Sequence, residues 1–217
     1  MRNALATPIL QCCEFDVMVT NMAVSRTYTM KVRAASAAVT AERIVDATKD
    51  LFIENVIAEI TLADIAARAG VTVQTVLRRF GDKDALFAAA VARFASQVTA
   101  QRGQATPGSL DDAVVNLVEH YETWGPLMLK MLAEENTTPA IHNIVQFGKT
   151  FHRDWCQTVF ADTLAPLRNE ERDRRLAQLV AICDIRTWEL LRITSGLTRP
   201  QTQRALHEML EPLITKD

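Results

Sequence analysis

The segment from Thr61 to Lys83 constrains the fold of this chain more than any other stretch. It reads TLADIAARAGVTVQTVLRRFGDK. Thr61 with Asp64 predicts a capped helix start, and Gly70 supplies the left-handed residue that ends this short helix. Helix restarts almost at once, and Ala66 is small enough for the second helix to pack across it. Two short helices around a tight glycine turn indicate a helix-turn-helix.

The second short helix presents polar and small side chains at its start, whereas Val76 anchors it to a core. The residues expected on or near the outward face are Thr72, Val73, Gln74, Thr75 and Arg78. A glutamine can pair with adenine edges, and valine or threonine methyl groups can touch thymine methyls in a major groove. Arg78, Arg79 and Lys83 supply positive charge for phosphates. The segment therefore predicts binding of double-stranded DNA.

The composition supports a helical protein and excludes several classes. Only 7 Gly and 7 Pro occur in 217 residues, which disfavours a fold of many short strands and tight turns. The net charge of −2 excludes a chain that is basic throughout but not a local basic patch. No apolar run approaches the roughly 18 residues that span a bilayer, and the four cysteines lack zinc-like spacing. We therefore expect a cytoplasmic protein with reduced thiols, without membrane association, metal or cofactor.

Apolar periodicity predicts about nine helices, no strand and three regions. Residues 1–38 are expected to be a flexible arm with the basic residues Arg2, Arg26, Lys31 and Arg33. The last three either enter a minor groove or stay unbound. Residues 39–85, starting at a cap on Thr40, form a three-helix DNA-binding domain. Residues 86–217 form a helical effector-binding and dimerisation domain. In it we expect a helix break at Gly125-Pro126 and one uninterrupted helix over 170–195.

Residues 40–90 resemble the TetR family of bacterial transcriptional regulators. The resemblance rests on Gly70, Val71, Thr75, Phe80, Lys83 and Leu86. The sequence departs from the family pattern at Leu77, where a phosphate-contacting tyrosine is usual, and at Gln74, where glycine is common. Arg78 or Arg79 could replace the contact of the missing tyrosine.

The resemblance also implies DNA contacts and an all-α, two-domain architecture. It implies phosphate-backbone contacts from Thr40, Thr61, Thr75 and Lys83. It implies base contacts from Thr72, Val73 and Gln74. Repression by operator occupancy is likewise an expectation from the family.

Residues 110–163 are rich in bulky groups that helical spacing makes mostly core. The TetR resemblance implies an effector pocket in this region, and aromatic and methionine side chains suit a small apolar or aromatic molecule. The candidate lining residues are Tyr121, Trp124, Met128, Met131, Phe147, Phe151 and Trp155.

Residues about 170–214 carry apolar stripes that fit either a core or an interface, and Trp188 could belong to either. Two helix-turn-helix heads must be held at a fixed separation to read a palindrome, so we expect a twofold homodimer. The family resemblance puts its contact in these last helices.

Two other functions stay open: a helical enzyme with an apolar pocket and a helical adaptor that binds protein. An enzyme would need a positioned nucleophile, base or metal, and none is evident. Glu134 and Glu135 are adjacent on a helix, so they are expected to be a solvated pair rather than an acid–base couple. His152 and Cys156 share a helix face that excludes Asp154, so no triad follows. We therefore predict a ligand-responsive DNA-binding regulator with no catalytic residues.

Overall fold

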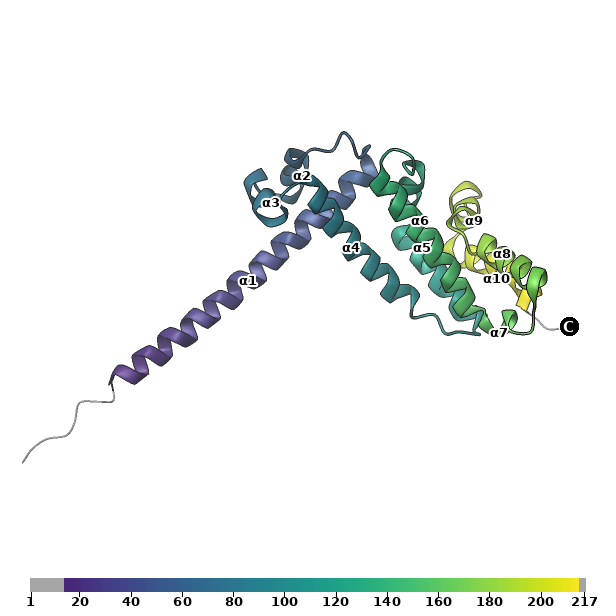
Figure 1. Cartoon of the computed structure of the whole chain (residues 1–217), viewed down its shortest axis with the longest axis horizontal. Coiled ribbons are helices and arrows are strands. Elements are labelled where there is room, and N and C mark those ends of the chain that lie inside the picture. Colours follow the sequence, from purple (N-terminus) through teal and green to yellow (C-terminus); the bar gives the residue numbers. More distant parts are fainter. Residues whose placement is uncertain (1–13, 215–217) are drawn as a thin grey trace, which may run out of the picture. The chain divides into compact units, whose positions relative to one another are not determined.

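The computed structural model describes residues 14–214, with side chains from Val32 onward except that of residue 33. The described part consists of helices joined by loops and contains no strand, which confirms the all-α prediction (Figure 1). The helices are α1 (Glu14–Glu54), α2 (Leu62–Ala69), α3 (Val73–Phe80), α4 (Lys83–Arg102), α5 (Leu110–Ala133), α6 (Pro139–Val159), α7 (Ala161–Leu164), α8 (Asn169–Ile182), α9 (Ile185–Trp188), the π-helical η1 (Glu189–Thr194) and α10 (Arg199–Ile214). Among these described helices, none is long and apolar enough to cross a bilayer.

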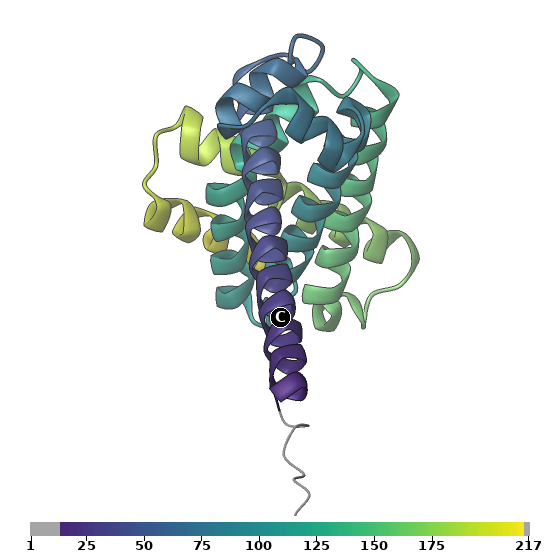
Figure 2. The ribbon, with the colours of Figure 1, turned by 90° about the vertical axis from the view of Figure 1, so that its left-hand side faces the viewer.

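Helix α1 is longer than the sequence pattern predicted. It begins at Glu14 and continues without a break to Glu54 (Figure 2). The expectation that residues 14–38 lack helix is wrong, and the physical reason is that this stretch contains neither glycine nor proline. Thr40 is not a cap, because its hydroxyl lies within α1 and donates to the Ser36 carbonyl at 2.9 Å. Arg2 and the side chains of Arg26, Lys31 and Arg33 lie outside the described residues.

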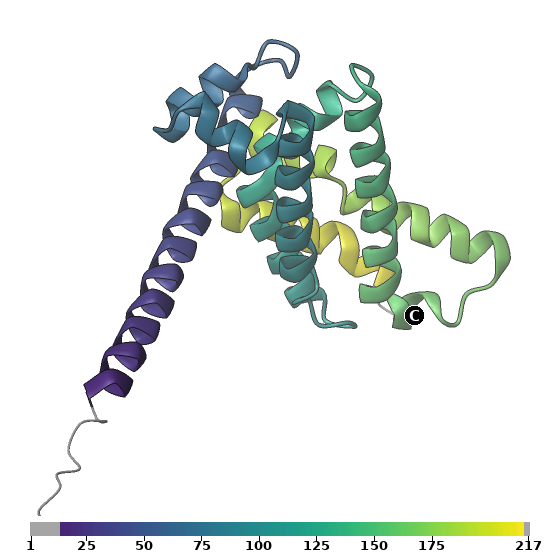
Figure 3. The same cartoon turned by 60° about the vertical axis from the view of Figure 1, so that its left-hand side comes forward.

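The chain divides into two units, one ending at Ile44 and one beginning at Val45. In the second unit α3 packs against α2 and against α4 (Figure 3). The end of α1 contacts α4, where the ring centroids of Phe52 and Phe87 lie 6.5 Å apart. Arg68 of α2 binds the Glu54 carboxylate through two hydrogen bonds of 3.0 and 2.6 Å. The apolar side chains buried here include Val45, Leu51, Phe52, Ile60, Ile65, Ala66, Ala69, Val76 and Leu86. This small core fixes α2 and α3 on α4.

Helix α5 packs against α4, α6, α9 and α10 and is continuous through Gly125 and Pro126. The predicted break there is therefore wrong. Gly125 serves packing instead, because a Cβ atom at this position would lie 2.7 Å from two ring carbons of Trp188. Trp188 is itself buried in the core of its own chain, which resolves its role in favour of packing.

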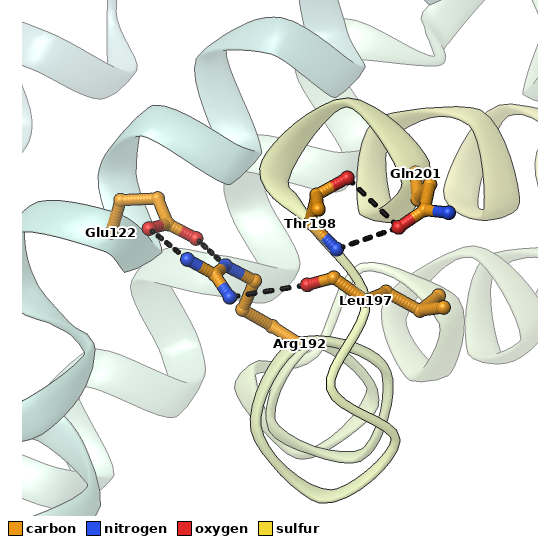
Figure 4. Close-up of polar contacts among 5 residues, drawn as sticks. All are labelled: Glu122, Arg192, Leu197, Thr198 and Gln201. Atoms are coloured by element: carbon orange, nitrogen blue, oxygen red, sulfur yellow. Dashed lines mark hydrogen bonds and ion pairs between the residues drawn. The ribbon is translucent and has the colours of Figure 1, made fainter.

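The predicted helix over 170–195 is also wrong, since the structure divides it into three segments. Helix α8 ends at Ile182, and the Asp184 carboxylate accepts from the Arg186 amide at 2.8 Å to start α9. The π-helical turn η1 follows and places Arg192 against Glu122 of α5, with hydrogen bonds of 2.8 and 3.4 Å (Figure 4). An acidic N-cap inside a run of helix formers is the signal that periodicity missed.

Helix α10 begins at Arg199, directly after Thr198. The Gln201 side chain accepts hydrogen bonds from the Thr198 amide at 2.9 Å and from the Thr198 hydroxyl at 2.8 Å (Figure 4). Arg192 also donates to the Leu197 carbonyl at 3.1 Å, so η1 and the start of α10 are connected.

Candidate DNA-binding surface

The helix-turn-helix forms as the sequence predicts. The Thr61 amide donates to the Asp64 carboxylate at 2.9 Å, and the Asp64 amide donates to the Thr61 hydroxyl at 3.2 Å, which completes a capping box. Gly70 has φ 63° and ψ 41°, the left-handed conformation that turns the chain out of α2. Both caps are made by residues within a few positions of one another, so this turn is specified locally.

The first turn of α3 faces away from the core. Thr72 is its N-cap and accepts from the Thr75 amide at 3.2 Å, while Val76 in the next turn is completely buried. Thr72, Val73 and Gln74 are exposed, and the valine keeps 38% of its surface accessible. The Gln74 side chain makes no hydrogen bond with any residue between 14 and 214, so its side-chain amide is free for another partner. This exposure is what base contact requires, and the contacts themselves stay predictions.

The basic groups around α3 differ in their freedom. Arg78 and Arg79 are exposed on the last turns of the helix. Lys83 is half-buried, and its ammonium donates to the Ile57 carbonyl at 3.0 Å. An ammonium carries three donors, so a phosphate contact by Lys83 remains compatible with this bond. Lys83 thus has a structural partner that the sequence did not reveal.

Glu134 is a further residue that sequence reasoning missed. The prediction of a solvated Glu134–Glu135 pair is wrong for Glu134, which is only 6% exposed. Its carboxylate accepts from the Ile57 amide at 3.2 Å and lies 2.9 Å from the Lys130 ammonium. Ile57, in the loop between α1 and α2, therefore bonds through its carbonyl to Lys83 and through its amide to Glu134 at the end of α5. No local pattern could have shown a contact between positions so far apart in sequence.

The seven candidate effector-lining residues fall into different environments. Tyr121 and Trp155 are buried in the core, whereas Phe147 is 60% exposed and stacks on Phe151 with ring centroids 6.4 Å apart. Trp124, Met128, Met131 and Phe151 are half-buried. The structure therefore does not gather all seven around one space. That some of them contact an effector stays a prediction.

A surface hollow of about 490 Å³ lies beside α10, and none of these seven residues lines it. Its lining residues are Gly108, Leu110, Val159, Phe160, Asp162, Thr163, His207, Glu211 and Ile214.

A buried polar cluster lies where α4 ends, and it too was missed. Arg102, the last residue of α4, is only 2% exposed, and its guanidinium carbon lies 3.5 Å from the centre of the Trp155 ring. Its Nη2 lies 3.4 Å from Nδ1 of His152, and its carbonyl accepts from the Trp155 indole at 3.0 Å. Burial, with the nearby charges of Arg102 and His152, lowers the pKa of His120 to about 3. An arginine at a helix C-terminus is normally solvated, so the burial of Arg102 was not predicted.

Comparison with known proteins agrees with this geometry. Residues 44–90 match the family model for bacterial regulatory proteins of the tetR family. No curated protein sequence matches the chain. A transcriptional regulator from Rhodococcus sp. Rha1 has a similar fold with TM-score 0.61 and 19% identity, covering 80% of this chain and 95% of that one.

A transcriptional regulator of the TerR/AcrR family from Aquifex aeolicus VF5 is similar with TM-score 0.59 and 16% identity, covering 80% of this chain and 99% of that one. At such identities the likeness concerns the fold, and the family match concerns the helix-turn-helix with the helices on either side of it. A matched DNA-binding segment within a shared regulator fold indicates a regulatory protein rather than an enzyme. Residues 44–90 therefore carry the helix-turn-helix of the tetR family of bacterial regulatory proteins, and the chain shares the fold of these two regulators.

Proposed function

We propose that this chain is a ligand-responsive transcriptional repressor that binds a palindromic operator as a homodimer. The observation that carries the proposal is the first turn of α3, which is exposed while the cap at Thr72 and the buried Val76 hold it in place. A rigidly held helix start with exposed polar side chains suits direct readout in a major groove.

The dimer contact is proposed to use the outward faces of residues 170–214. The buried leucines of this region pack within their own chain, so they are not free to contact a partner. Leu190, Ile193 and Met209 are exposed instead, and exposed large apolar side chains are typical of an interface core. Twofold pairing through this surface would hold two α3 helices at the fixed separation that a palindrome requires.

The proposed ligand response needs a physical connection between the second domain and the head. The bonds from Ile57 to Glu134 and to Lys83 supply one, because they join the end of α5 to the start of α4 through the backbone of a single residue. An effector that shifts the end of α5 would alter this connection. It changes DNA affinity only by binding the two arrangements differently.

The test is a gel shift with DNA from upstream of the protein's own gene, against a shuffled sequence of equal length at moderate salt. We expect a shift of the natural fragment that the shuffled one does not compete away. Equal retention of both fragments, or none of either, would contradict the proposal and favour a helical enzyme or a protein-binding adaptor. Sedimentation of the complex gives the number of chains per fragment, for which we expect an even number.

A further inference from the structure

Arg102 is a buried charge without a counterion in the part of the chain that the structure describes. No carboxylate between residues 14 and 214 forms an ion pair with its guanidinium, and its Nη1 atom has no hydrogen-bond partner there. A buried ionised group without a partner is strongly unfavourable, and a guanidinium is not readily deprotonated. The free energy of the ligand-free fold is therefore raised at this position.

The side chains around Arg102 do not neutralise it. Trp155 offers only the face of its ring, and His152 contacts the guanidinium through one long hydrogen bond of 3.4 Å. His120 is uncharged because burial lowers its pKa, and burial raises the pKa of the Tyr121 hydroxyl, so that group stays neutral too. The Tyr121 hydroxyl moreover already donates a hydrogen bond to the Cys183 carbonyl at 2.9 Å.

One internal group could act as an anion, the thiol of Cys156. Its sulfur lies 3.9 Å from Nε2 of His152, and a hydrogen bond from Cys183 and the contact with His152 favour the thiolate, while burial opposes it. No hydrogen bond joins this sulfur to Arg102 in the described structure. The guanidinium therefore keeps free donors even if the thiol ionises.

A second donor in the same core also lacks an acceptor. The indole nitrogen of Trp188 is buried and without a partner among residues 14–214, and its ring lies 5.8 Å from that of Tyr121. Two unsatisfied N–H donors within a core of aromatic side chains call for an acceptor from outside the chain.

We propose that Arg102 binds the carboxylate of a small effector whose body is apolar or aromatic. The inference rests on the proposed ligand response and names the chemical class of its ligand. A carboxylate matches the planar fork of a guanidinium with two parallel hydrogen bonds and cancels its single charge. The rings of Tyr121 and Trp155 suit the rest of the molecule.

The position of Arg102 connects this site to the head. Arg102 is the last residue of α4, and Lys83, which holds the Ile57 carbonyl, is the first. A ligand that draws Arg102 out of its stack on Trp155 shifts the C-terminal end of a helix whose other end carries the helix-turn-helix. A packed helix transmits such a shift as a rigid body.

The experiment measures the thermal unfolding of the full chain with three carboxylates and their neutral amides: benzoate, phenylacetate and octanoate against benzamide, phenylacetamide and octanamide, at constant ionic strength. Wild-type protein is compared with Arg102→Lys, which keeps the charge but loses the fork, and with Arg102→Met. Arg153→Met, an exposed arginine on α6, is the matched control.

We expect at least one carboxylate to raise the Tm of wild type and of Arg153→Met by about 2–4 °C at saturation, and its amide to raise it by less than half as much. In Arg102→Lys the rise should fall by at least half. The inference is overturned if no carboxylate raises the Tm of wild type, if the amides act equally, or if the rise persists in Arg102→Lys. If Arg102→Met does not fold, Arg102→Lys alone decides.

DNA binding is measured separately on the same samples by gel shift. Specific DNA binding without a carboxylate response would overturn this inference and leave the proposed DNA-binding function intact. A carboxylate response without specific DNA binding would support the Arg102 site and overturn the proposed function.

Discussion

The helix-turn-helix and the core of the second domain satisfy their polar groups in different ways. In the helix-turn-helix, Thr61 bonds with Asp64 and Thr72 with Thr75, each within three residues. In the second domain, the Tyr121 hydroxyl reaches the Cys183 carbonyl across 62 positions, and the Trp155 indole reaches the Arg102 carbonyl across 53. The helix-turn-helix is thus specified by short caps, whereas the core of residues 86–217 depends on contacts that form only when distant helices meet.

This difference predicts that the second domain is the more sensitive to a change of one methyl group. Gly125→Ala places a Cβ atom 2.7 Å from ring carbons of Trp188, which is a collision within a packed core. We expect the free energy of unfolding to fall by about 1–3 kcal/mol. Chemical denaturation measures it.

Gly148→Ala is the matched control, because Gly148 also lies within a helix and a Cβ there meets nothing within 4 Å. This variant should gain about 0.5–1 kcal/mol from helix propensity. A loss of equal size in both variants would show that the glycines act through the backbone, and the contrast drawn from Trp188 would fail.

The buried network of the second domain also predicts acid sensitivity. The pKa of His120 is lowered from 6.5 to about 3 by burial and by the charges of Arg102 and His152, so the unfolded chain takes up the proton first. Stability is therefore present above pH 6.5 and is lost as the pH falls from about 6.5 toward 3, at up to roughly 1.4 kcal/mol per pH unit.

His120→Gln should lower this slope between pH 6.5 and 5, a difference of about 2 kcal/mol over that interval at most. Denaturation at several pH values measures it, and His142→Gln, at an exposed position on α6, serves as control. The same acid sensitivity in wild type and in His120→Gln would show that the proton goes elsewhere.

On the exposed face of the helix-turn-helix, truncation of a side chain should leave stability unchanged but lower the affinity for DNA. Gln74→Ala removes an exposed side chain, so its Tm should not change. Affinity for the cognate operator should fall about tenfold, near 1.4 kcal/mol, with little change on random DNA. Fluorescence anisotropy measures both, and Gln97→Ala, exposed on α4, is the control. Equal losses on cognate and random DNA would count against base reading by Gln74.

The same contrast explains how much the sequence could predict. The cap at Thr61 and the turn at Gly70 were predicted because each signal and its partner lie within four residues. The burial of Arg102 and Glu134 was not, since their partners lie on other helices and periodicity assigns charged residues to solvent. The continuity of α5 at Gly125 was not predicted, because tertiary packing on Trp188 overrides local propensity there. The break at Asp184 was missed for another reason, since its signal is a local cap that apolar periodicity does not register.

Lys83 combines a position that the sequence predicts with a bond to a residue distant in sequence. Its variant is expected to have the smallest effect of those considered. In the sequence Lys83 follows α3 closely, yet its ammonium bonds to the Ile57 carbonyl. Lys83→Ala should reduce the dependence of log K on log salt by about one unit for every DNA sequence. It should also lower Tm slightly through the lost bond, whereas Arg78→Ala, at an exposed position, should reduce the slope alone. If Lys83→Ala lowers Tm and leaves the salt slope unchanged, its charge serves the loop rather than DNA. In that case the helix-turn-helix would depend on a long-range contact at the start of α4 as well as on its local caps.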